Sequence, residues 1–177
     1  MQKTRFLIPI AVFSLFLGAC ASMTTADTTP NSDPHIAGIV VNANQGEIDQ
    51  GNAAAAKASS ADVRAFAQMM VSDHTTALAA ARDTAARANI MPMDNDTTAA
   101  LQRTSRETIT NVGTYTGRDF DRVYMQSQVD LHQWLLTALD QQLIPLATNR
   151  DLKSLLETQR ASVAAHLDRA RAIRAGL

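Results

Sequence analysis

Apolar residues recur at helical spacing along four stretches of the chain, and polar or Gly- and Pro-containing segments separate these stretches. Within each stretch the apolar positions step by three or four residues, which places their side chains on one face of an α-helix. The pattern therefore predicts four amphipathic helices, at about residues 34–58, 62–88, 119–143 and 150–173. Their stripes are Ile36, Val40, Ala43, Glu47, Gly51, Ala54 and Ala58; Val63, Ala67, Met70, His74, Ala77, Ala81, Ala85 and Ala88; Met125, Val129, His132, Leu136, Leu139 and Leu143; and Leu152, Leu156, Gln159, Val163, His166, Ala170 and Ile173.

Short signals mark the ends of these predicted helices. Asp33 is a suitable cap before Pro34, a residue that favours the first turn of a helix. Residues 59–62 supply a cap and an acidic first turn for the second helix. Pro145 has no backbone N–H, so we expect it to end the third helix. Gly51, on the stripe of the first helix, would allow a neighbouring helix to approach closely.

The longest interruption of the pattern covers residues 90–118. Asp96 can cap a further helix of weak amphipathicity there, and Gly113 and Gly117 then break the chain. A connection of this length can cross a bundle from one end to the other. The predicted fold is therefore all-α, a ferritin-like four-helix bundle with a long, partly helical crossover between helices 2 and 3.

The N-terminus has the features of a targeting segment. Lys3 and Arg5 precede an apolar run over residues 7–17, which is too short for an ordinary bilayer span. The following Leu17-Gly18-Ala19-Cys20 resembles the lipobox of bacterial lipoproteins, in which the chain is cut before the cysteine and the cysteine is lipidated. An ordinary signal peptide cut at a small residue is the alternative.

These features divide the chain into three parts. Residues 1–19 are predicted to be a lipoprotein-type signal peptide, residues 20–34 a polar, disordered tether, and residues 35–175 the bundle domain. Ala21 follows the cysteine, and resemblance to enterobacterial lipoproteins then implies the outer membrane. We therefore expect an exported, periplasm-facing protein whose partner is the membrane, held through a lipid anchor at Cys20.

Charge and cysteine content limit the binding partners and the disulfide bonds that we expect. The formal net charge is -1 and the sequence has no basic run, so nothing indicates a nucleic-acid partner. Cys20 is the only cysteine, and its lipidation would leave no thiol for a disulfide. The alanine-rich faces of the first two helices leave self-association open, and no protein partner can be named.

Four ionisable residues interrupt the predicted apolar stripes, one on each helix. Glu47 lies on the first stripe, His74 on the second, His132 on the third and His166 on the fourth. The fourth histidine of the chain, His35, lies at the start of the domain. Polar side chains from four separate helices would therefore point toward the bundle axis.

The heights of these four residues in the bundle agree in part. Glu47 and His74 lie at similar distances from the first interhelical turn, and His132 lies near the middle of its helix. His166 is about five residues further from its turn than His132, which corresponds to about 7 Å at the rise of an α-helix. We expect His74, His132 and Glu47 to converge within about 5 Å, and His166 fits less well.

The chemistry of this set suits a metal ion. Three imidazoles and a carboxylate are ligands for Zn, Fe, Cu or Ni rather than for Ca or Mg. Asp73 is turned about 100° from His74 on the helix, so we expect it to be an outer partner or a surface group. The alternatives are buried histidines that each hydrogen-bond to a neighbour, and a pH-sensitive structural cluster.

Several segments together resemble a known family of bacterial exported proteins. They are residues 62–74 (DVRAFAQMMVSDH), residues 117–124, His132 and residues 166–170. The chain resembles domain-of-unknown-function family 4142, over about residues 36–173. The resemblance implies a ferritin-like fold and an outer-membrane or periplasmic location, and it implies no established activity.

One departure from ferritin-like proteins limits the chemistry. Di-iron members carry Glu-x-x-His on two helices, whereas Val71 and Val163 stand three residues before His74 and His166. A single ion is therefore favoured over a di-iron centre. We expect metal binding or buffering, or a role in envelope stress, rather than catalysis; the alternatives are a metal-free structural or interaction module and a metal-dependent redox enzyme.

Overall fold

The computed structural model describes residues 32–177. The predicted signal peptide, the lipobox cysteine Cys20 and most of the predicted tether lie outside the described residues. Within residues 32–177 the secondary structure is helical and contains no strand, which confirms the prediction of an all-α bundle. No helix of residues 32–177 combines the length and the apolar character that crossing a membrane would require.

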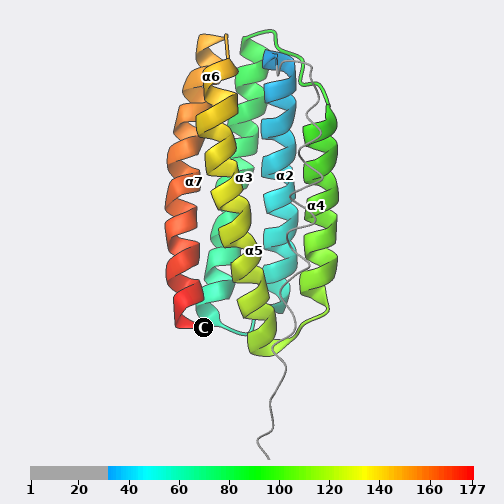
Figure 1. Ribbon diagram of the computed structural model, residues 1–177, viewed down its shortest axis with the longest axis vertical. Coiled ribbons are helices and arrows are strands. Elements are labelled where there is room, and N and C mark those ends of the chain that lie inside the picture. The colour runs from blue at the N-terminus through cyan, green and yellow to red at the C-terminus, as the bar shows by residue number, and fades with distance from the viewer. Residues whose placement is uncertain (1–31) are drawn as a thin grey trace, which may run out of the picture.

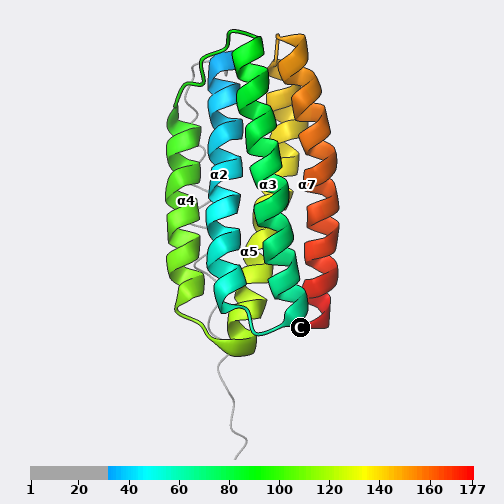
Figure 2. The same cartoon turned by 180° about the vertical axis from the view of Figure 1, so that it is seen from behind.

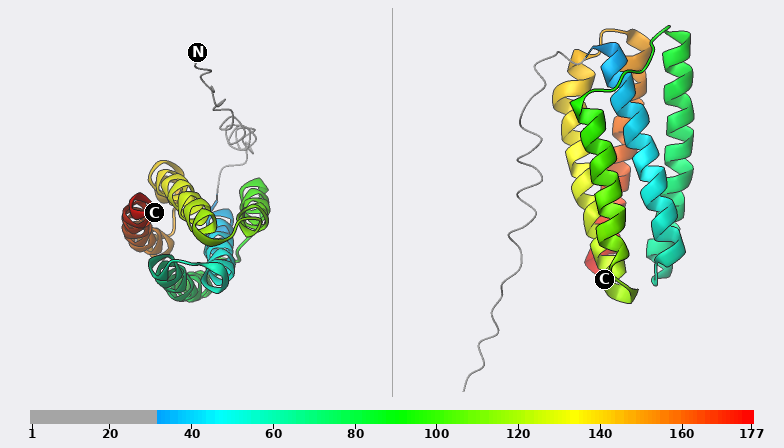
Figure 3. Two further views of the ribbon diagram at one scale, coloured as in Figure 1. Left: turned by 90° about the horizontal axis from the view of Figure 1, so that it is seen from below. Right: turned by 90° about the vertical axis from the view of Figure 1, so that its right-hand side faces the viewer.

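Four long helices form the bundle, and a fifth lies outside it (Figure 1). The elements in chain order are α2 (Asp33–Lys57), α3 (Ala61–Arg87), α4 (Asp96–Gly113), α5 (Gly117–Ala138), a π-helical turn η2 (Leu139–Leu143), α6 (Ile144–Leu146) and α7 (Arg150–Gly176). Helices α2 and α3 form one antiparallel hairpin, and α5 and α7 form another (Figures 1 and 2). Helix α4 runs along the outside of the bundle against α2 and α5, so the crossover is more helical than its sequence pattern suggested (Figure 3).

The bundle contains two apolar clusters, one in each half of its length. One cluster includes Ile36, Leu139 and Leu152, and the other includes Phe66 and Tyr124. Along every long bundle helix, the ionisable residue of the predicted stripe falls between the residues of the two clusters. The middle of the bundle is therefore a buried polar layer between two apolar cores.

Close approach of α2 and α3 depends on a glycine. A Cβ atom at Gly51 would come within 3.0 Å of the carbonyl oxygen of Ala67 and within 2.8 Å of a methyl carbon of Val71. Since a backbone oxygen cannot move aside cheaply, α3 packs directly on the backbone of α2 at this point. The predicted close approach at Gly51 is confirmed.

Two aspartates fix the hairpins to each other, and this arrangement differs from the predicted caps. Asp33 does not cap its own helix; its carboxylate accepts hydrogen bonds from the backbone N–H groups of Thr148 and Asn149, at 2.9 Å each. Asp121 likewise accepts from the N–H groups of Ser59 (3.0 Å) and Ser60 (2.8 Å) at the start of α3. Each aspartate lies on the first helix of one hairpin and binds the turn of the other, a long-range contact that local sequence signals do not reveal.

The expected stop at Pro145 is wrong. The chain stays helical through Leu146, because the π-helical turn bonds the N–H of Ile144 to the carbonyl of Leu139 and shifts the hydrogen-bond pattern just before the proline. His132 therefore lies 14 residues before the end of this helical run, and His166 lies 16 residues after the start of α7. The difference between His132 and His166 in their distance from the turn therefore falls from about five residues to two, or about 3 Å along the helix axis.

Candidate metal centre

Three histidines from three helices meet in the polar layer. His74 on α3, His132 on α5 and His166 on α7 each supply one ring nitrogen, and these nitrogens lie within 4.8 Å of one another. The ring centroids are 5.3–6.1 Å apart. His74 and His166 are 6% exposed and His132 is not exposed at all. The structure thus brings together the three predicted histidine ligands, including the one that fitted least well.

A buried amide sets the protonation of His74. The amide nitrogen of Asn44 donates to the carbonyl of Val40 at 2.8 Å, which fixes the orientation of the amide. The Asn44 oxygen then lies 2.8 Å from Nδ1 of His74 and must accept a hydrogen bond there. Nδ1 of His74 therefore carries the proton, and Nε2 keeps its lone pair.

The other two rings are fixed in the same way by groups that can only accept. Nδ1 of His132 lies 2.9 Å from the carbonyl oxygen of Gln128, one helical turn earlier on α5, so this nitrogen carries the proton. Nε2 of His166 lies 3.0 Å from a carboxylate oxygen of Asp73 and donates to it. Asp73, which we expected to be an outer partner or a surface group, contacts the histidine of another helix rather than its sequence neighbour.

The remaining ring nitrogens have no partner. Nε2 of His74, Nε2 of His132 and Nδ1 of His166 are buried and make no hydrogen bond with any of residues 32–177. A buried polar atom without a partner costs about 1–3 kcal/mol, so three such lone pairs in one layer are unfavourable. A cation bound between the rings would satisfy all of them at once.

Burial keeps two of these rings neutral. Burial, together with the smaller effects of the neighbouring His132 and His166, lowers the pKa of His74 to about 3. Burial and His166 lower the pKa of His132 to about 4, although the hydrogen bond to the Gln128 carbonyl opposes this shift. Both rings are therefore uncharged at neutral pH, which is the form that binds metal ions.

Glu47 is buried in the same layer but is not a member of the three-nitrogen group. Its Oε1 lies 3.8 Å from Nδ1 of His132, the nitrogen that already faces the Gln128 carbonyl. Neither carboxylate oxygen has a hydrogen-bond partner among residues 32–177. Burial raises the pKa of Glu47 to about 8, and the Gln128 side chain partly offsets the rise. Glu47 therefore lies beside the protonated edge of the His132 ring, outside the group that the sequence predicted it to join as a fourth ligand.

One nitrogen from each ring lies at a spacing that a metal ion could close. Tetrahedral Zn²⁺ binds imidazole nitrogens at about 2.0–2.1 Å, so nitrogen ligands around one ion lie about 3.3 Å apart. Separations of up to 4.8 Å must therefore shorten by at most about 1.5 Å. Each ring is also held through its second nitrogen, the support that metal-bound histidines usually have.

Sequence reasoning missed two of the supporting residues and placed one histidine correctly outside the site. Asn44 stands three residues before Glu47 on α2, and Gln128 stands four before His132 on α5, so helical spacing alone could have placed both on the inner faces. His35 lies at the start of α2 beside Ser32, away from the three-histidine group.

Comparisons with known proteins give a family and nothing more detailed. No curated protein and no solved structure matches the chain at a significant level. The resemblance noted in the sequence is confirmed at the level of the family, although its members' location and activity are not thereby established. The family model described as a domain of unknown function, DUF4142, matches residues 18–173, and the chain therefore belongs to the DUF4142 family.

Proposed function

We propose that the bundle binds one transition-metal ion through His74, His132 and His166. The observation that supports this proposal is the shared pattern of the three rings: one nitrogen of each is held by a protein acceptor, and the other is buried without a partner. Isolated core histidines would each need a local arrangement for both nitrogens. Here the second nitrogen of every ring is left for a common ligand.

The donor set favours particular ions and a binding role. Nitrogen donors suit Zn, Cu, Fe or Ni, and the group contains too few carboxylates for a di-iron centre. The role we propose is metal binding or buffering in the cell envelope. Three protein ligands also leave one coordination position open, which makes a metal-dependent redox reaction the second candidate. Peroxide or oxygen consumption that requires the metal and is lost in His74→Ala would support this second candidate.

We also propose that the domain is held at the membrane, at the outer membrane of a Gram-negative cell, by a lipid on Cys20. The lipobox-like residues 17–20 support this location. Cells fed a labelled fatty acid should incorporate the label into the wild-type protein and not into Cys20→Ser. Equal labelling of both proteins, or of neither, would contradict the anchor.

Metal titration of the purified protein without its first 20 residues tests the central proposal. We expect elemental analysis to find about one metal ion per chain, and Zn, Cu, Fe or Ni to raise the thermal unfolding temperature. His74→Leu, His132→Leu and His166→Leu should each abolish the gain, while His35→Leu, outside the group, should keep it. Metal at background level together with no stabilisation by any of the four ions would favour a metal-free structural module.

A further inference from the structure

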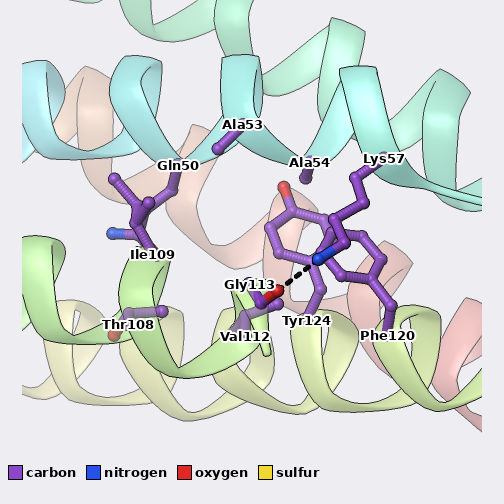
Figure 4. A pocket seen from close by; sticks show the side chains of 10 residues that line it. All are labelled: Gln50, Ala53, Ala54, Lys57, Thr108, Ile109, Val112, Gly113, Phe120 and Tyr124. Carbon is purple, nitrogen blue, oxygen red and sulfur yellow. Dashed lines mark hydrogen bonds between the residues drawn. The ribbon is translucent and has the colours of Figure 1, made fainter. Parts of the chain in front are cut away.

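A hollow in the protein lies away from the histidines, between α2, α4 and α5. It has a volume of about 130 Å³ (Figure 4). The crossover helix α4 forms its outer wall through Ile109, Val112 and Gly113, and Phe120 and Tyr124 of α5 form its floor. Ala53 and Ala54 of α2 contribute only methyl groups, so the space beside them stays open. The walls are largely apolar.

A single cation stands at this hollow. Nζ of Lys57 donates a hydrogen bond to the carbonyl oxygen of Gly113 and lies 5.4 Å from the centre of the Phe120 ring (Figure 4). Among residues 32–177, no carboxylate pairs with this ammonium group. An ammonium has three N–H donors, so Lys57 keeps donors for a further acceptor.

A buried hydroxyl in the floor also lacks a partner. Tyr124 is 2% exposed, and its hydroxyl makes no hydrogen bond with any of residues 32–177. Burial raises the pKa of Tyr124, so the group remains a phenol that can donate. Figure 4 shows this hydroxyl directed toward α2 beside Ala54, and its oxygen has almost no accessible surface, so it lies behind the wall of the hollow. Lys57 is therefore the donor that a ligand in the hollow can reach.

We propose that this hollow binds a small organic carboxylate with a compact apolar body. The apolar walls would bury the body, and the carboxylate would accept a hydrogen bond from Lys57 at the edge of the hollow. The size supports the class, because an engineered apolar cavity of about 150 Å³ holds benzene. A ring or branched chain of about six carbons fits, whereas a peptide or a long acyl chain does not.

Three ligands of equal shape and different charge test the proposal on the purified protein. Benzoate, benzamide and benzamidine share one ring and carry a negative, a neutral and a positive group. Titration calorimetry and ligand-observed NMR should find benzoate bound at least about tenfold more tightly than benzamide, as a charge-assisted hydrogen bond requires. Benzamidine should bind most weakly.

Two variants with matched controls locate the binding. Lys57→Gln should bring benzoate and benzamide to similar affinities, and Lys153→Gln, which removes a lysine charge on α7, should keep the preference. Ala53→Phe places a ring at the rim of the hollow from an exposed position and should abolish binding, while Ala56→Phe, at an exposed position outside the lining, should not.

The proposal is overturned if wild type does not bind benzoate, if all three ligands bind equally, or if Ala53→Phe leaves binding unchanged.

Discussion

Replacing His132 with leucine should make the metal-free protein more stable than the wild type and the metal-loaded protein less stable than the wild type. His132 is completely buried, and its Nε2 has no hydrogen-bond partner. Its Nδ1 donates to the Gln128 carbonyl, an oxygen that also accepts the helical N–H four residues later. A leucine of similar size therefore removes one unpaired nitrogen and leaves no new group unpaired.

The expected changes have opposite signs in the two states. Without metal, removal of one unpaired buried nitrogen should raise the free energy of unfolding by about 1–3 kcal/mol, and the melting temperature by about 3 °C for each kcal/mol. With metal at 1,000 times its dissociation constant, the wild type gains about 4.1 kcal/mol, which exceeds the variant's advantage without metal, and the variant loses most of this gain with its ligand. The order of stability of the two proteins should therefore reverse when metal is added.

Urea unfolding at pH 6.5, once with a chelator and once with excess Zn²⁺, would measure both effects. His35→Leu serves as the control, because it lies outside the group and should leave the metal-dependent gain unchanged. His74→Leu should gain less than His132→Leu without metal, since it leaves the Asn44 oxygen without its donor. A loss of stability in His132→Leu with the chelator present, or an equal gain from Zn²⁺ in both proteins, would refute the reasoning.

Three further predictions concern the surroundings of the site. Metal-free stability should be greatest near pH 6.5. Above that pH the folded state still holds the Glu47 proton, which the unfolded chain has released, so stability falls until about pH 8; Glu47→Gln should remove this decline in pH-dependent unfolding. Below pH 6.5, His74 and His132 stay neutral in the folded state, whereas the same two histidines take up protons in the unfolded chain. This difference of two protons is larger than the difference of one proton at Glu47, so stability falls toward pH 4. Asp73→Asn should weaken metal binding about 10- to 100-fold in calorimetry, because it removes the charge behind a ligand, while the more exposed Asp168→Asn should not. Asp121→Ala should cost about 1–2 kcal/mol in chelator-treated urea unfolding, since two N–H groups at the start of α3 lose their acceptor, and a change below about 0.3 kcal/mol would argue against that role.

Helical periodicity was sufficient for the fold because each long helix buries one continuous face. The stripe of α7 shows this: Leu152, Leu156, Val163 and Ala170 are all buried where the spacing placed them. Periodicity could not reveal where the helical run that begins with α5 ends. A proline normally ends a helix, and only the π-helical turn before it, which depends on local hydrogen bonding, carries the chain through Pro145.

The sequence located the three histidines of the candidate site, but it did not reveal that Asn44 and the Gln128 carbonyl hold two of their rings. Histidines at apolar positions of three stripes were conspicuous, because few polar residues occupy such positions. The amides of Asn44 and Gln128 were not conspicuous. Asn and Gln occur on any face of a helix, so the sequence pattern does not indicate which of them are buried. Glu47 illustrates a further limit: its stripe placed it in the correct layer, but which side of the His132 ring it approaches depends on side-chain rotamers.

The two aspartate contacts at the ends of the bundle allow positions in the two hairpins to be compared. Asp33 and Asp121 each lie near the start of the first helix of a hairpin and bind the turn of the other, so they fix the register between the hairpins. Counted from these aspartates, His132 lies eleven residues after Asp121, and Asn44 lies eleven residues after Asp33. Asn44 therefore occupies on α2 the place that a ligand occupies on α5. Because an amide stands there and accepts the proton of His74, α2 supports a ligand of its own hairpin instead of supplying one, and the donor set keeps an open side.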